Sequence, residues 1–169
     1  MTTEIVFAYY PSPVGILRVS SKGNCISEIH FWDKPPDVHV EYQAAFPLPP
    51  VLQQCIDELI EYFNGNRRAF TVPVQQEGTE FQMRVWNELL NIPYGKTISY
   101  LDLAKRLGDP KAIRAAASTN GKNNIAIIVP CHRVIGSNND LVGYGGGLWR
   151  KRWLLQMEAK HLYGIQELF

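Results

Sequence analysis

The sequence predicts an α+β fold in two domains, a small sheet-containing domain over residues 1–78 and a mainly helical domain over residues 79–169. Extended, β-prone stretches lie near the N-terminus, and apolar residues recur at helical spacing from residue 79 onward. The irregular stretch Arg67–Gly78 separates the two patterns. A chain of 169 residues is long enough to give each domain a buried core.

The first domain is expected to hold an antiparallel meander and one helix. Ile5–Tyr10 and Gly15–Ser20 flank a Pro-Ser-Pro-Val-Gly turn, and Cys25–Trp32 is a third extended stretch. After the proline-rich segment Lys34–Pro50, apolar residues at helical spacing predict a helix over Val51–Asn64 that an Asn-Gly pair ends.

The second domain is expected to begin with a helix whose apolar stripe runs from Phe81 to Leu90. Thr97 is the predicted cap of the next helix, which runs to Leu107, and a Gly-Asp turn precedes Pro110 near the start of another. This order of a helix, a glycine-containing turn and a second helix is typical of a helix-turn-helix. Many helical proteins, however, also join two short helices by a glycine turn. The predicted core of this domain is Phe81, Val85, Trp86, Leu89, Leu103, Leu107, Ile127, Trp153 and Leu154.

The helix that follows Pro110 has an unusual composition. Lys111–Asn120 presents small side chains around a single Arg114, which allows the backbone to approach another surface closely. The alternative is that the alanines pack against a neighbouring helix while Arg114 points to solvent.

A cysteine follows the most apolar segment of this domain. Ile125–Val129 is predicted to be a buried strand that delivers Cys131, next to His132 and Arg133. Such an electropositive setting lowers the pKa of a thiol and makes the thiolate available as a nucleophile. The alternative is a cysteine that merely packs while His132 faces away.

The composition is that of an ordinary globular protein, with 46% hydrophobic and 20% charged residues. We expect no membrane span, because no apolar run approaches about 20 residues, and no secretory signal, so the expected location is the cytoplasm. The net charge is only +1, but residues 1–80 carry 5 Lys/Arg and 10 Asp/Glu whereas residues 81–160 carry 12 and 5. The second half is therefore the one suited to meet phosphates.

The three cysteines, Cys25, Cys55 and Cys131, form no CxxC pair, and their odd number argues against a disulfide framework. Cys25 and His30 are possible zinc ligands, but His39 and Cys55 follow no recognisable ligand spacing and a structural zinc site needs four ligands. We expect no metal, and we interpret Cys25 and Cys55 as small buried hydrophobes.

Several blocks of the second half together resemble the O6-alkylguanine-DNA alkyltransferase family. The pentapeptide Pro130–Val134 resembles the active-site signature of that family, and the resemblance covers roughly residues 79–160. In the first domain only the strand Pro13–Leu17 is loosely similar. The other matching blocks are Phe81–Trp86, Ile92–Tyr100, the helix with Arg114, Tyr144–Gly147 and Trp153–Glu158.

The resemblance implies the chemistry of direct-reversal repair, in which Cys131 accepts an alkyl group from O6 of guanine, with O4 of thymine as a further site. His132 would act as the base through a bound water, and Glu158 would orient His132. Asn123 would support and polarise the site beside the cysteine, and the hydroxyl of Tyr100 would donate to the departing guanine. The reaction would be stoichiometric and would require no cofactor.

The resemblance also implies how DNA is bound. A monomer would flip the alkylated nucleotide out of double-stranded DNA, with Arg114 filling the vacated space. Ala115 would approach the minor groove, and Lys111 would contact phosphates. The walls of the guanine pocket would be formed by Val134, Tyr144 and Gly145. The implied fold is a ribonuclease H-like N-terminal domain followed by a winged-helix-like domain that carries the helix-turn-helix.

Two positions depart from the family pattern. Ile113 lies beside the arginine where some relatives have alanine, and Asn124 follows Asn123 where proline is common. The first departure would alter how the helix lies in the groove, and the second would loosen the loop that supports Cys131. The resemblance gives Lys151 two interpretations, assistance to the leaving guanine or simple capping and solvation of the last helix, and we favour the second.

Two other functions stay open at this point. A non-catalytic damage sensor would resemble this family but replace the nucleophile, so the presence of Cys131 argues against it. A cysteine hydrolase would share a Cys-His-carboxylate set, but it would regenerate its thiol and turn over, whereas a thioether on Cys131 is not readily hydrolysed.

Overall fold

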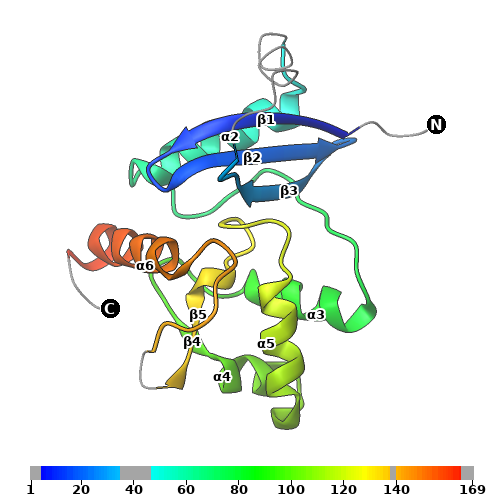
Figure 1. The fold of residues 1–169 in the computed structure, drawn as a ribbon, viewed down its shortest axis with the longest axis vertical. Coiled ribbons are helices and arrows are strands. Elements are labelled where there is room, and N and C mark those ends of the chain that lie inside the picture. Colours follow the sequence, from blue (N-terminus) through cyan, green and yellow to red (C-terminus); the bar gives the residue numbers. More distant parts are fainter. Residues whose placement is uncertain (1–4, 35–46, 138–139, 165–169) are drawn as a thin grey trace. The chain divides into compact units, whose positions relative to one another are not determined.

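The computed structural model describes residues 5–34, 47–137 and 140–164, and the chain divides into two units, Met1–Gln76 and Glu77–Phe169 (Figure 1). The boundary expected from the sequence, after residue 78, falls beside this division. His39, considered above as a zinc ligand, and most of the proline-rich segment lie outside the described residues. Within the described part of the chain, no helix is both long and apolar enough to cross a membrane.

The first unit is a three-stranded antiparallel sheet with one described helix packed against it (Figure 1). The strands β1 (Ile5–Ser12), β2 (Gly15–Lys22) and β3 (Cys25–Phe31) lie in sequence order, because each is joined to the next by a tight turn. The helix α2 (Pro50–Phe63) contacts all three strands. The core between helix and sheet contains Ala8, Leu17, Val19, Ile26, Ile29, Leu52, Cys55 and Leu59.

A buried carboxylate fixes the end of the first unit to α2. Glu58 is 3% exposed, and it accepts hydrogen bonds from the backbone N–H groups of Thr71 (2.8 Å) and Val72 (3.1 Å) and from the Thr71 hydroxyl (2.7 Å). Burial alone would raise the pKa of this carboxyl, but the hydrogen bonds from Gln54, Thr71 and Val72 lower it below its usual value.

Replacing Glu58 with alanine is expected to lower the free energy of unfolding by about 2 kcal/mol, because two backbone donors lose a charged acceptor. Chemical denaturation of the full chain measures the effect. Glu61→Ala is the matched control: its side chain is 45% exposed and pairs with Arg67, so the expected loss is below about 1 kcal/mol. Equal losses in the two variants would contradict a structural role for Glu58.

The second unit begins with α3 (Glu80–Leu89), whose N-cap Thr79 forms a reciprocal capping box with Gln82. The next helix, α4 (Tyr100–Arg106), is capped by Ser99 through a capping box with Asp102. The predicted cap Thr97 is therefore wrong. The chain remains extended through Ile98 and Ser99, because these residues form strand β4, which pairs in parallel with β5 (Val134–Ile135).

The helix α5 (Ile113–Gly121) follows α4 after a short turn. Gly108 turns the chain with φ +86°, and the carboxylate of Asp109 caps one turn of 3-10 helix, Pro110–Ala112, before α5 begins. The helices α4 and α5 pack against each other, and α3 packs against both (Figure 1). The last described helix, α6 (Leu148–Tyr163), ends at Gly164 in a left-handed conformation.

The apolar segment before the cysteine is not a strand. Ile125–Val129 is a buried turn closed by hydrogen bonds from the N–H of Ile128 to the carbonyl of Ala126 (2.8 Å) and from the N–H of Val129 to that of Ile125 (3.1 Å). Ile127 has φ +73°, a conformation that is costly for a β-branched residue. The strand prediction failed because a short apolar run fits any buried conformation.

Candidate active site

The thiol of Cys131 lies in the interior of the second unit. Cys131–Arg133 forms one turn of 3-10 helix, and Cys131 is 7% exposed. The Asn123 amide nitrogen lies 3.2 Å from Cys131 Sγ, 2.8 Å from the Val129 carbonyl and 3.2 Å from the Ile125 carbonyl. The Asn123 carbonyl accepts the N–H of Ile125 at 3.1 Å. Asn123 therefore holds the buried turn in place, and the sulfur shares its amide group with the two carbonyls.

His132 and Glu158 form a buried pair beside the cysteine. His132 Nε2 lies 2.7 Å from Glu158 Oε2, and both side chains are completely buried. Arg133 is the second partner of this carboxylate, because its Nε donates to Glu158 Oε1 at 2.9 Å and its Nη2 to Oε2 at 3.1 Å. The backbone N–H of Gly95 also donates to Oε1. His132 Nδ1 is buried and has no hydrogen-bond partner among the described residues.

The surroundings of this pair set its charge state. Burial would raise the pKa of the Glu158 carboxyl, but the charges and hydrogen bonds of His132 and Arg133 outweigh burial and lower it well below its usual range. Burial lowers the pKa of His132, although Glu158 opposes this effect. At neutral pH we therefore expect an ionised Glu158 and a neutral His132, which is the state in which an imidazole acts as a base.

Cys131 differs from the sequence-based expectation. Burial raises the pKa of its thiol, and the hydrogen bond from Asn123 and the charge of Lys151 only partly oppose this effect. The predicted lowering of the thiol pKa by neighbouring cations is therefore wrong for the free protein, because desolvation outweighs the attraction. The thiol rests protonated and needs a base to become nucleophilic.

Lys151 is buried, which contradicts the interpretation that it caps and solvates α6. Its side chain is completely inaccessible, and its Nζ donates to the carbonyls of Val134 (2.7 Å), Val142 (3.0 Å) and Gly143 (3.5 Å). Burial lowers the pKa of Lys151 to about 8, and the charge of Cys131 opposes this shift. Lys151 therefore connects α6 to β5 and to the loop of Val142 and Gly143, and it places a positive charge near the thiol.

Replacing Lys151 with methionine is expected to slow alkylation of Cys131 about tenfold near pH 7, because losing a nearby cation shifts a thiol pKa by about one unit. Lysine carries its charge only below its pKa of about 8. The ratio of wild-type to variant rates should therefore shrink as the pH rises through about 8. Single-turnover rates across this range measure it, with the exposed Lys160→Met on the same helix as control. A ratio independent of pH would contradict an electrostatic role.

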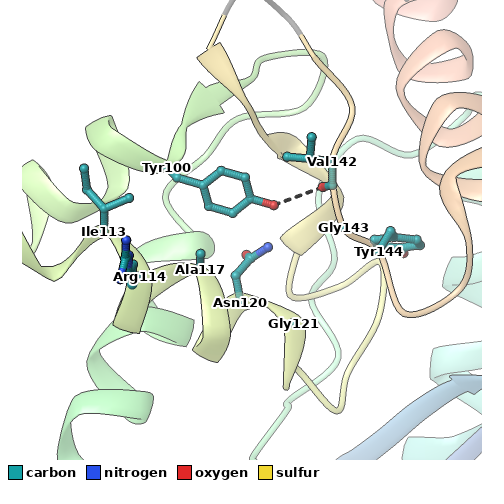
Figure 2. A pocket seen from close by; sticks show the side chains of 9 residues that line it. All are labelled: Tyr100, Ile113, Arg114, Ala117, Asn120, Gly121, Val142, Gly143 and Tyr144. Carbon is teal, nitrogen blue, oxygen red and sulfur yellow. Dashed lines mark hydrogen bonds between the residues drawn. The ribbon is translucent and has the colours of Figure 1, made fainter.

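A pocket of about 440 Å³ opens beside these groups (Figure 2). The hydroxyl of Tyr100 donates to the Val142 carbonyl at 3.2 Å across this pocket. Burial raises the pKa of the Tyr100 hydroxyl, the charge of Cys131 raises it further, and the amide of Asn120 opposes both effects. The pocket is lined by Tyr100, Ile113, Arg114, Ala117, Asn120, Gly121, Val142, Gly143 and Tyr144.

The structure brings some of the predicted substrate-binding residues to this pocket and not others. Arg114 and Tyr144 line it, whereas Lys111 and Ala115 are exposed beside Arg114 and are not among its lining residues. Gly145 is exposed next to Tyr144. Val134 is completely buried in β5, away from the pocket lining, and its carbonyl serves Lys151.

Three residues at the site were not assigned these roles from the sequence: Arg133, Lys151 and Asn120. Arg133 adjoins the cysteine, and its burial follows from two partners distant in sequence, Glu158 and the carbonyl of Ile92, which its Nη1 reaches at 2.7 Å. Asn120 is 4% exposed, and its amide nitrogen donates to the Cys131 carbonyl at 3.3 Å. Asn120 is the last of three polar residues, Ser118–Asn120, that end an alanine-rich helix, and the sequence offers no signal that distinguishes it from the other two.

A buried thiol, an adjacent histidine and a carboxylate that binds the histidine are typical of proteins in which cysteine is the nucleophile. The pocket and the exposed Arg114 further place this class of site next to a basic helix surface.

Comparison with known families defines the class further. Residues 5–76 match the ribonuclease-like domain of 6-O-methylguanine DNA methyltransferase, and residues 80–160 match its DNA binding domain. The chain belongs to the 6-O-methylguanine DNA methyltransferase family. The resemblance inferred from the sequence and the predicted α+β fold are thereby confirmed.

Individual relatives cover nearly the whole chain. The methylated-DNA–protein-cysteine methyltransferase of Haemophilus influenzae is 41% identical over 157 residues, which are 92% of this chain and 87% of that protein. The Mycobacterium bovis protein of the same name is 43% identical and covers 94% of each chain. The crystal structure of Mycobacterium tuberculosis O6-methylguanine methyltransferase superposes with a TM-score of 0.82 at 39% identity, over 96% of this chain and 97% of that one. A structure of the Mycobacterium tuberculosis OGT in complex with DNA has a TM-score of 0.80 at 41% identity, over 92% and 93%.

Proposed function

We propose that this protein repairs DNA by transferring an alkyl group from O6 of guanine to Sγ of Cys131, irreversibly and once per molecule. The observation that supports the proposal best is the buried Cys131 beside the 2.7 Å His132–Glu158 pair and the pocket, in a chain of the methyltransferase family. O4 of alkylated thymine is a second proposed substrate.

The proposed reaction begins with removal of the thiol proton. A water bound to His132 Nδ1, the buried nitrogen that has no hydrogen-bond partner in the described part of the chain, would carry the proton from Cys131 to the imidazole. Glu158 would hold the imidazole through Nε2 and stabilise the imidazolium. Asn123 would stabilise the sulfur anion through the amide N–H that it shares with the neighbouring carbonyls. These groups compensate for the burial that raises the pKa of the thiol.

The thiolate would then attack the alkyl carbon. A carbon–sulfur bond forms as the bond between carbon and O6 breaks, and the electron pair stays on the guanine. Tyr100 would donate a hydrogen bond to the departing base, for which its hydroxyl must release the Val142 carbonyl. The displacement requires no metal or organic cofactor. Because the thioether is stable, the thiol is not regenerated.

The target base must leave the helix before this reaction, because the thiol is buried. We propose that α4 and α5 act as a helix-turn-helix on double-stranded DNA, with Ala115 near the minor groove and Lys111 at a phosphate. Arg114 would fill the space of the flipped nucleotide. Tyr144 would pack on the base in the pocket. Val134 and Gly145 do not line the pocket, so we propose that they act indirectly, by supporting the segments that carry its walls.

We also propose that the protein acts as a monomer in the cytoplasm. One flipped nucleotide needs one thiol, and a reducing compartment suits the free cysteines Cys25, Cys55 and Cys131. Cys55 is an inert core thiol, because burial and Glu58 raise its pKa to about 12. In the described residues, no three His, Cys, Asp or Glu side chains cluster as a metal site requires.

The test is mass spectrometry of the intact protein and its peptides after incubation with a duplex containing one O6-methylguanine. We expect one added methyl group on Cys131, none in Cys131→Ser, and normal transfer in the matched control Cys25→Ser. Restored thiol with many products per protein would indicate a hydrolase. Tight binding without transfer would indicate a damage sensor, and either result would overturn the proposal.

A further inference from the structure

The helix α5 presents one large apolar side chain at its surface. Ile113, the first residue of α5, is 37% exposed, whereas every other described isoleucine of the second unit is at most 8% exposed. The remaining exposed positions of α5 hold Arg114, Ala115, Ser118 and Gly121. Single exposed apolar residues are common on protein surfaces, so the position of Ile113 decides what it can do.

Ile113 lies at the rim of the pocket, next to cations. Figure 2 shows Ile113 and Arg114 on the α5 side of the pocket and Tyr144 on the opposite side. Lys111, two residues before Ile113, is also exposed. An apolar side chain with cations beside it complements a DNA duplex, whose charged phosphates flank the apolar faces of its base pairs.

The helix geometry gives Ile113 and Arg114 different places on the duplex. Consecutive side chains of a helix point about 100° apart, so the two residues do not cover the same spot. In the proposed function Arg114 fills the space that the flipped nucleotide leaves. Next to that space lies a base pair that has lost its stacking partner. Proteins that deform DNA through the minor groove use isoleucine, among other apolar residues, to pack on such a face.

We propose that Ile113 packs on the base pair next to the flipped nucleotide and thereby lowers the cost of extruding the alkylated base. This inference rests on the proposed alkyl transfer from a flipped base. The aliphatic side chain replaces part of the stacking that the neighbouring pair loses, whereas the alanine that some relatives carry at this position would leave that face uncovered. Ile113 therefore acts in the extrusion step and not in the displacement at Cys131.

The experiment compares single-turnover methyl transfer by the wild type and Ile113→Ala from O6-methylguanine in three duplexes. One duplex is intact, and in each of the others the base pair on one side of the lesion is replaced by two abasic sites. On the intact duplex we expect Ile113→Ala to be about fivefold slower, the effect of losing one partly buried aliphatic contact. On one of the abasic duplexes the two proteins should agree within about twofold, because the pair that Ile113 covers is absent.

Further measurements exclude damage to the pocket or the fold. Ile113 lines the pocket, so each variant is also tested on the free O6-methylguanine nucleoside, where its rate should stay within about twofold of the wild-type rate. Ile113→Thr keeps the branched shape but is polar, and it should show the same pattern as Ile113→Ala. Leu90→Ala is the matched control, because Leu90 is an exposed aliphatic residue of the same unit outside the pocket lining. It should change no rate by more than about twofold.

The outcomes separate this inference from the function on which it rests. Absence of methyl transfer to Cys131 of the wild type from every substrate would refute the proposed function. Three results would overturn the role of Ile113 and leave the repair function intact: wild-type rates of both Ile113 variants on the intact duplex, equal losses on all three duplexes, or a loss on the nucleoside as large as on the intact duplex.

Discussion

Replacing Glu158 with glutamine is expected to lower the free energy of unfolding by about 3–5 kcal/mol and to reduce alkyl transfer at least 100-fold, the cost of leaving a buried charge without its partner. Arg133 is 6% exposed, and Glu158 is its charged partner through two hydrogen bonds of 2.9 and 3.1 Å. The same change removes the charge that would stabilise a protonated His132. The free energy of unfolding and the rate of alkyl transfer are therefore expected to fall together in this variant.

The wild-type protein should also be the more sensitive to acid. Glu158 has a lowered pKa in the folded state, so its stabilising contribution is present above the unfolded value of about 4.3 and is lost as the pH falls toward the folded pKa. Glu158→Gln lacks this contribution. The stability difference between wild type and variant should therefore shrink below about pH 4.

Urea denaturation followed by tryptophan fluorescence, at neutral and acidic pH, measures both expectations. Glu88→Gln is the control, because Glu88 is also in the second unit but is partly exposed and lies 3.8 Å from Arg106. The free energy of unfolding of Glu88→Gln should fall by less than about 1 kcal/mol. A variant at Glu158 as stable as this control would show that the buried network does not hold the site together.

Replacing Arg114 with alanine is expected to slow repair of a lesion in duplex DNA about 100-fold, because extruding a base costs a few kcal/mol that the arginine would offset by filling the stack. Arg114 is exposed on α5 and lines the pocket mouth. Its removal should leave the free energy of unfolding within about 0.5 kcal/mol of the wild-type value.

The measurement compares transfer from duplex O6-methylguanine with transfer from the free nucleoside, which needs no extrusion. Arg114→Ala should lose most of its rate on the duplex and little on the nucleoside. Arg152→Ala, which removes an exposed cation from α6, should change both rates only slightly. Equal losses of Arg114→Ala on duplex and nucleoside would place Arg114 in the chemistry and would refute its role in extrusion.

Local patterns predicted the elements well where a repeated signal existed. The strands of the first unit, α2 and α3 lie within a few residues of their expected bounds, because alternation, helical spacing and capping residues each act over a short range. Ile125–Val129 failed because five apolar residues specify burial but no backbone conformation. Thr97 failed because the competing cap Ser99 has its reciprocal partner Asp102.

The site was only partly predictable for a different reason. Cys131 was a candidate from its neighbours alone, whereas the roles of His132 and Glu158 came from a resemblance, and the structure places His132 against Glu158. The neighbouring His132 and Arg133 suggested a lowered thiol pKa, whereas desolvation by the surrounding unit raises the pKa of Cys131. Lys151 and Arg133 are buried only because carbonyls and a carboxylate from distant segments satisfy them, and no local pattern reports such partners.

The helix α6 carries both Lys151 and Glu158, two helical turns apart, while the thiol they serve belongs to a segment made earlier during synthesis. A nascent chain that has emerged only as far as Cys131 has neither the carboxylate nor the ammonium group near its sulfur. The thiol therefore acquires the charge of Lys151 and the carboxylate that orients His132 only when α6 packs against the rest of the second unit. The route for removing the thiol proton through His132 and Glu158 is therefore complete only in the folded second unit.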